Sequence, residues 1–128
     1  MTPTDLVRVW VERFNKADSD GLAKLYAPNA LNDQVVFSSP LSGRDAIREM
    51  FETEFSRATM VCVEEQIYEC GDTAILQWRD PLGLRGCGFF QIRNDQIIHQ
   101  KGYFDQLSFF RAQGIEVPDD YLGDTNSR

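Results

Sequence analysis

The sequence predicts an α+β domain in which three N-terminal helices pack on a strongly curved, mostly antiparallel sheet. In its first part, apolar residues recur at the spacing of a helix, and capping residues precede these stretches. Later segments are rich in β-branched and aromatic residues and are separated by turn signals. We expect one domain over residues 1–118, followed by a polar and flexible tail over residues 119–128.

Local signals predict the three helices in chain order. Thr2 can cap the first helix in a capping box with Asp5, and this helix should stop near Lys16. A short second helix should follow the cap candidate Asp18 and end at Pro28. A capping box over residues 42–45 predicts the third helix at about residues 43–56.

The remaining apolar segments predict strands joined by short turns. Consecutive strands with short connections form an antiparallel meander, and the helices should cover one of its faces. The expected strands are residues 35–40, 59–69, 73–80, 85–93 and 97–109.

Composition excludes several classes of protein. The net charge is −7 and the basic residues are scattered, so nucleic-acid binding is not expected. No apolar run approaches the roughly 18 residues that a membrane span needs, and the N-terminus has no signal-peptide pattern, so we expect a cytoplasmic protein without membrane contact. The three cysteines lack Cys-x-x-Cys spacing and should be reduced packing residues. No metal cluster, phosphate-binding loop or serine-nucleophile elbow occurs in the sequence.

Asp105 closes the last apolar segment, in a stretch that contains four aromatic residues. Charged side chains are seldom buried without a partner. This carboxylate is therefore a solvated strand-end group, or one paired with an arginine such as Arg79, or part of a pocket that raises its pKa toward neutrality.

The order of the elements and their motifs resembles the nuclear-transport-factor-2-like superfamily, and most of all its SnoaL-like branch of polyketide cyclases and ketosteroid-isomerase-like proteins. The resemblance covers residues 5–114 and is carried by Phe14 to Asp18, Asp20 to Ala27, Pro40 to Ile47, and Ile97 to Asp105. It implies a cone-shaped sheet around an apolar internal pocket, a small hydrophobic ligand, no cofactor and no bound metal, and a homodimer through the open sheet face.

The resemblance also implies roles for single residues. Asp105 matches the acid/base aspartate of the cyclases and of limonene epoxide hydrolase, and Asp80 matches a supporting aspartate of that hydrolase. Asp80 could equally start the turn that follows it. Trp78 stands where the hydrolase has an arginine, and Ser39 stands where ketosteroid isomerase has its general base. The candidate pocket lining is Trp10, Phe14, Tyr26, Phe37, Phe51, Trp78, Phe90 and Tyr103.

His99, the single histidine, could move a proton near neutral pH, or it could lie on the solvent face with Lys101. Two functions therefore remain open. One is a cofactor-independent lyase, isomerase or cyclase that uses Asp105 on a small hydrophobic substrate. The other is a non-catalytic module for small-molecule binding or dimerisation, which the incomplete catalytic set favours. A protein-partner domain ranks last.

Overall fold

The computed structural model describes residues 1–35 and 39–117 and confirms the α+β class. Its helices are α1 (Pro3–Asn15), α2 (Ser19–Ala23), α3 (Arg44–Arg57) and α4 (Gln106–Ala112). Its strands are β1 (Tyr26–Gln34), β2 (Leu41–Ser42), β3 (Val63–Cys70), β4 (Thr73–Arg79), β5 (Arg85–Arg93) and β6 (Gln96–Phe104).

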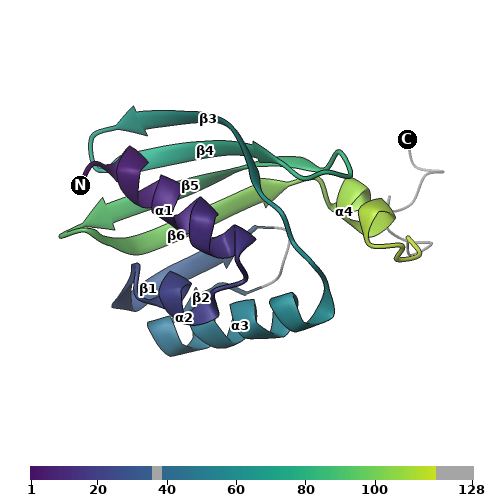
Figure 1. The fold of residues 1–128 in the computed structure, drawn as a ribbon, viewed down its shortest axis with the longest axis horizontal. Helices are drawn as coiled ribbons and strands as arrows, with labels where there is room; N and C mark the ends of the chain where they lie inside the picture. Colours follow the sequence, from purple (N-terminus) through teal and green to yellow (C-terminus); the bar gives the residue numbers. More distant parts are fainter. Residues whose placement is uncertain (36–38, 118–128) are drawn as a thin grey trace, which may run out of the picture.

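The strands form one curved sheet in the order β2-β1-β6-β5-β4-β3. The meander from β3 to β6 is antiparallel, as predicted, whereas β1 runs parallel to β6. The helices α1, α2 and α3 lie on one side of the sheet, and α4 follows β6 at the far end of the molecule (Figure 1). We call the side under the helices the inner face and the opposite side the outer face.

The predicted cap of α1 is confirmed and that of α3 is wrong. Thr2 Oγ1 accepts from the Asp5 amide, and Asp5 Oδ2 accepts from the Thr2 amide, both at 3.1 Å. At α3 the N-cap is Gly43, which makes no side-chain cap bond and has a φ of 97°. That backbone conformation favours glycine, and it lets the Gly43 amide donate to the Ala30 carbonyl of β1 at 2.8 Å.

Two predicted boundaries are corrected. Residues 24–28 do not extend α2, because β1 begins at Tyr26, whose backbone pairs with Ile97 of β6. The strand expected over 35–40 is not formed by Val35 or Ser39, and residues 36–38 lie outside the described part of the chain. The last strand ends at Phe104 rather than at residue 109, because α4 starts directly afterwards.

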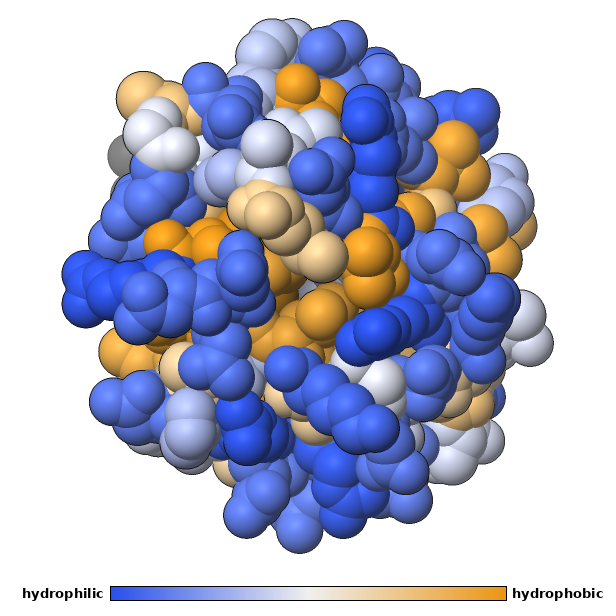
Figure 2. All heavy atoms as spheres, turned by 60° about the vertical axis from the view of Figure 1, so that its left-hand side comes forward, coloured by the Kyte–Doolittle hydropathy of each residue, from blue (hydrophilic) through white to orange (hydrophobic). Residues whose placement is uncertain are grey.

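The core lies between the inner face and the helices. It is built from apolar side chains of α1, α2, α3 and alternate residues of the strands, among them Leu6, Leu22, Ile47, Leu76 and Ile97. Figure 2 shows one end of the molecule as a largely hydrophilic surface with hydrophobic atoms gathered near the middle of the view. All three cysteines are free thiols, and Cys62 is buried in this core.

Over residues 1–35 and 39–117, no helix combines the length and the apolar character that crossing a membrane requires. The predicted tail, residues 119–128, falls outside the described residues.

Candidate functional site

Asp105 is an exposed helix cap. Its Oδ2 accepts hydrogen bonds from the Ser108 amide at 3.0 Å and from Ser108 Oγ at 2.6 Å, and these bonds cap α4. The hydrogen bonds from Ser108 lower the pKa of Asp105, the side-chain bond most of all. Of the alternatives for Asp105, the structure agrees with the solvated group at the end of the strand and not with the pocket that raises the pKa, because the carboxylate is hydrogen-bonded at the surface.

This geometry predicts how α4 responds to pH. Because the pKa of Asp105 is lowered in the fold, its ionised form stabilises α4 above the ordinary value of 3.8, and this stabilisation is lost as the pH falls through the lowered pKa. Asp105→Ala should reduce the hydrogen-exchange protection of the Ser108 amide at neutral pH. Asparagine can still cap a helix but does not ionise, so in Asp105→Asn the Ser108 amide should stay protected, and its protection should not fall on acidification as it does in the wild type. Equal protection in the wild type and in Asp105→Ala would contradict this role.

Asp80 organises the turn between β4 and β5. Its Oδ1 accepts from the amides of Leu82 at 2.9 Å and Leu84 at 2.8 Å. These contacts are the ones expected if Asp80 starts the turn that follows it. Asp80 and Asp105 therefore bind different turns, and no hydrogen bond between described residues joins them.

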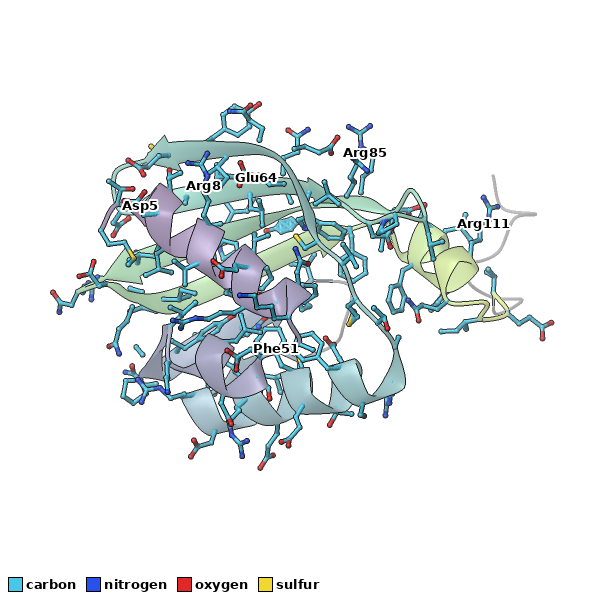
Figure 3. The ribbon with its side chains drawn as sticks, in the orientation of Figure 1. Asp5, Arg8, Phe51, Glu64, Arg85 and Arg111 are labelled. Atoms are coloured by element: carbon cyan, nitrogen blue, oxygen red, sulfur yellow. The ribbon has the colours of Figure 1, made fainter. Side chains whose placement is uncertain are left out.

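Five of the predicted lining residues gather on the inner face. The Trp10 ring lies 5.1 Å from Phe14, 5.2 Å from Phe90 and 6.2 Å from Phe51, and Phe51 lies 6.3 Å from Tyr26. Figure 3 shows Phe51 between α3 and the sheet. These rings form one aromatic cluster under the helices, at the centre of the core.

Of the other three predicted lining residues, the structure describes Trp78 and Tyr103, which are not part of this aromatic cluster. Trp78 also faces inward but packs on Phe104, at 6.3 Å between centroids, near the start of α4. Tyr103 is on the outer face against Phe89 and is 37% exposed, so its assignment to the inner lining is corrected. It points outward because it alternates with the inward-facing Gly102 along β6. Phe37 lies outside the described residues.

A chain of neutral polar side chains crosses the aromatic cluster. Trp10 Nε1 donates to the Tyr26 hydroxyl at 2.9 Å, and that hydroxyl donates to Gln100 Oε1. Asn32 Nδ2 donates to the same oxygen at 3.3 Å, and Gln34 Nε2 donates to Asn32 Oδ1 at 2.8 Å. We call these five residues the inner polar chain. Burial raises the pKa of the Tyr26 hydroxyl, so this group keeps its proton at physiological pH.

Backbone geometry places the inner polar chain. The β1–β6 register sets Asn32 beside Gln100 and Gln34 beside Gly102. A side chain on Gly102 would collide with the carboxamide of Gln34, so the glycine leaves room for it. Arg44 of α3 donates from Nε and Nη2 to the Tyr26 carbonyl at 2.9 and 2.7 Å, and this fixes the start of β1.

The sequence analysis missed Asn32, Gln34 and Gln100. Successive side chains of a strand point to opposite faces, so with His99, Lys101 and Tyr103 on one face of β6, Gln100 must lie on the other. The sequence alone does not show what Gln100 contacts there, because this depends on the pairing of β1 with β6. In the structure, Asn32 is 2% exposed and Gln100 is 5% exposed.

Two shallow hollows lie on the outer face. One, of about 190 Å³, is lined by His99 and Lys101 with Thr73, Phe89 and Gln91. The other, of about 600 Å³, contains the Arg85–Glu65 ion pair at 3.2 Å and is also lined by Gln77, Gly86, Cys87, Tyr103 and Phe104. His99 thus lies on the outer face with Lys101, away from the inner polar chain. The homodimer through this face stays a prediction.

The described residues hold no group of three or more histidine, cysteine, aspartate or glutamate side chains placed to bind a metal ion. The polar atoms of the inner polar chain belong to neutral amides, a phenol and an indole. This set can donate and accept hydrogen bonds, but it offers no charged ligand for a metal.

Comparison with solved structures assigns the fold to the NTF2-like class. A hypothetical protein with a ketosteroid-isomerase-like fold from Catenulispora acidiphila, solved in complex with trimethylamine, aligns with a TM-score of 0.79 at 15% identity, over 92% of this chain and 100% of that chain. An NTF2-like protein of unknown function from Cytophaga hutchinsonii gives a TM-score of 0.72 at 16% identity, over 86% and 96%. An LEH-like epoxide hydrolase from M. tuberculosis gives a TM-score of 0.73 at 18% identity, over 84% of this chain and 85% of that chain. At these identities the likeness concerns the fold alone.

The family follows from the sequence match. The family model described as a SnoaL-like domain matches residues 7–100, which is most of the chain. The chain therefore belongs to the SnoaL-like family. A search of curated proteins found no match.

Proposed function

We propose that this SnoaL-like domain binds a small, mostly apolar and uncharged molecule on its inner face, and that the inner polar chain provides the hydrogen bonds. The observation that supports the proposal most is the buried Gln100 carboxamide, whose nitrogen makes no hydrogen bond within residues 1–35 and 39–117. A polar group in an apolar interior costs free energy unless it is paired. Every fully buried side-chain nitrogen and oxygen among the described residues has a partner, so the Gln100 nitrogen keeps some accessible surface, and a bound molecule would give it a partner there.

The surroundings favour a neutral ligand. The buried polar residues among those described are two amides, Asn32 and Gln100, and Gln100 accepts a hydrogen bond from Tyr26 of the aromatic cluster. Bringing an ion into this environment without a countercharge would be strongly unfavourable. An aromatic or alicyclic molecule with one polar atom matches both the walls and the amides.

Binding is favoured over proton transfer by the state of the titratable groups. Asp105 is an exposed cap with a lowered pKa, and Asp80 accepts backbone hydrogen bonds in a turn. Tyr26 is buried with a raised pKa, and its hydroxyl donates a hydrogen bond to Gln100 Oε1. General acid/base catalysis requires a group with a pKa near neutrality in the site, and the lowered pKa of Asp105 and the raised pKa of Tyr26 both lie away from neutrality. Asp80 is held in a turn and not on the inner face.

The test is an NMR titration of ¹⁵N-labelled protein with neutral ring compounds: cyclohexanone, 1-indanone, 2-naphthol and indane. At least one compound should give saturable shifts of the Trp10 indole N–H and of the Gln100 side-chain amide. The Trp78 indole, which also faces inward and packs on Phe104, gives a second signal that shows whether the shifts reach beyond the aromatic cluster.

Two variants provide controls. Gln91→Leu, on the outer face, should leave the affinity unchanged, and Asp105→Asn should do the same. Shifts confined to the outer-face residues His99 and Tyr103 would overturn the proposal. Chemical conversion of a compound that Asp105→Asn abolishes would replace it with the acid/base enzyme.

A further inference from the structure

We infer that residues 58–62, which join α3 to β3, are a strap that opens to admit a small molecule to the inner face, and that the side chain of Asn15 holds this strap closed. The inference rests on the proposed function, because it supplies the route by which a ligand would reach the inner face. Figure 1 shows the strap rising from the end of α3, past the end of α1, to the start of β3.

A ligand of the inner face needs part of the protein to move. Trp10, Phe51 and Phe90 are 6%, 3% and 1% exposed, and Trp10 packs against both of the other rings. Side chains as buried as these become accessible only when a neighbouring segment opens. The helices α1 and α3 both bury apolar side chains in the core, so moving either helix would expose much of it. The strap can move at a smaller cost.

The strap has few attachments to the rest of the domain. It has no regular secondary structure, and residues 59–61 make no hydrogen bond with the described residues. At its start, the Ala58 amide donates to the Glu54 carbonyl at 3.3 Å and so ends α3. Within the strap, only Cys62 is buried. A segment with few buried contacts and few hydrogen bonds opens at a low free energy.

One side chain holds the other end of the strap. Asn15, the last residue of α1, donates from Nδ2 to the Cys62 carbonyl at 2.9 Å and accepts at Oδ1 from the Cys62 amide at 2.7 Å. A single carboxamide thus pairs with both backbone groups of Cys62. Asn15 is itself exposed, so water can compete for both hydrogen bonds. Breaking these two bonds frees the strap between α3 and β3.

The Cys62 thiol reports whether the strap opens. Cys62 belongs to the same buried core as Trp10 and Phe51, and burial raises the pKa of its thiol to about 12. Alkylating reagents react with the thiolate, so in the closed protein this thiol is both shielded and protonated. Once the strap opens, water reaches the thiol and it can ionise. Reaction with iodoacetamide, a small uncharged molecule, therefore measures entry to the inner face directly.

The test uses the full chain with Cys70→Ser and Cys87→Ser, which leaves Cys62 as the single thiol. Iodoacetamide labelling is followed by mass spectrometry at one mildly alkaline pH. Asn15→Ala should raise the labelling rate about 5- to 100-fold, the value of two net hydrogen bonds between neutral groups. Asn29→Ala is the matched control, because Asn29 is exposed and its side chain makes no hydrogen bond with the described residues. This control should stay within about twofold of the parent protein.

A second measurement separates opening of the strap from unfolding of the domain, and it needs no variant of Asn15 that could fail to fold. Hydrogen exchange of the Phe90 amide, in the middle of β5, reports the globally unfolded population. The open population that Cys62 labelling gives should exceed this value by more than about tenfold. Low concentrations of urea should speed Phe90 exchange and leave labelling nearly constant, because opening the strap exposes little surface.

The outcomes distinguish this inference from the proposed function. If Cys62 labelling and Phe90 exchange give the same population and rise together with urea, the strap does not open by itself and the inference is overturned, whereas ligand binding can still stand. If Asn15→Ala leaves the labelling rate unchanged, Asn15 does not hold the strap closed. If labelling behaves as expected but none of the ring compounds shifts the inner-face signals, the strap stands and the proposed function falls.

Discussion

Replacing Gln100 with leucine should lower the free energy of unfolding by about 2–5 kcal/mol. Leucine is close in size but cannot accept the hydrogen bonds that Tyr26 and Asn32 now donate to Gln100 Oε1. Both donors would remain buried without a partner, and each such orphaned group costs about 1–3 kcal/mol. Urea unfolding should show a lower midpoint with an unchanged m-value.

A double variant tests whether the loss of stability in Gln100→Leu comes from the donors left without an acceptor. Tyr26→Phe removes one of the two donors, so Tyr26→Phe/Gln100→Leu should be less destabilised than the sum of the single variants, by about 1 kcal/mol or more. Gln91→Leu is the matched control, because Gln91 makes no side-chain hydrogen bond to the described residues. A change of under about 0.5 kcal/mol in Gln100→Leu would show that the inner hydrogen bonds contribute little.

Phe51→Ala should cost about 3–5 kcal/mol, the usual range for removing a buried aromatic side chain. Phe51 is 3% exposed, and its ring lies near those of Trp10, Phe14, Tyr26 and Phe55, at 5.8–6.3 Å. Removing the ring would leave a cavity between α1 and α3, and these helices would have to shift to fill it. The variant should show both a lower melting temperature and a lower urea midpoint than the wild type.

The control for Phe51→Ala is Leu82→Ala, at a turn residue that is 74% exposed. This variant should stay within about 0.5 kcal/mol of the wild type. If Phe51→Ala were destabilised by less than about 1 kcal/mol, the aromatic cluster would not be the centre of the core.

The three N-terminal helices and the meander could be predicted because their signals are local, whereas α4 falls where the strand was expected to continue. The capping box of Thr2 and Asp5 forms as expected, and the strand predicted over 85–93 is β5 itself. Turn residues between β4, β5 and β6 fix their antiparallel pairing over short distances. These elements depend on neighbours in the sequence, which a single sequence contains.

The start of β1 could not be predicted, because a partner far along the chain decides it. Leu22, Leu25 and Tyr26 have helical spacing, and Pro28 resembles a helix stop. In the structure Tyr26 pairs with Ile97, and the β1–β6 register shifts before Leu31, so Pro28 lies where the ladder is interrupted. Tertiary pairing thus overrides the local helical preference.

The candidate site was predicted in part, and the reason is similar. The aromatic cluster could be anticipated from the resemblance, whereas the inner polar chain depends on which residues of β1 and β6 face each other. The sequence left Asp105 open between a pocket and a solvated strand end, because the expected strand ran on to residue 109. In the structure α4 begins after Asp105, and Ser108, three residues later, supplies the amide that an aspartate N-cap binds.

The parallel pairing of β1 with β6 has a consequence for how the chain acquires its interior. The hydrogen bond between Tyr26 and Gln100 joins residues 74 positions apart, and that between Asn32 and Gln100 joins residues 68 apart. Closing such long loops costs entropy before any contact compensates it. No fragment that stops before β6 can contain the inner polar chain. During synthesis, Tyr26 and Asn32 emerge from the ribosome long before their acceptor, and the site is completed only once nearly the whole domain has been made.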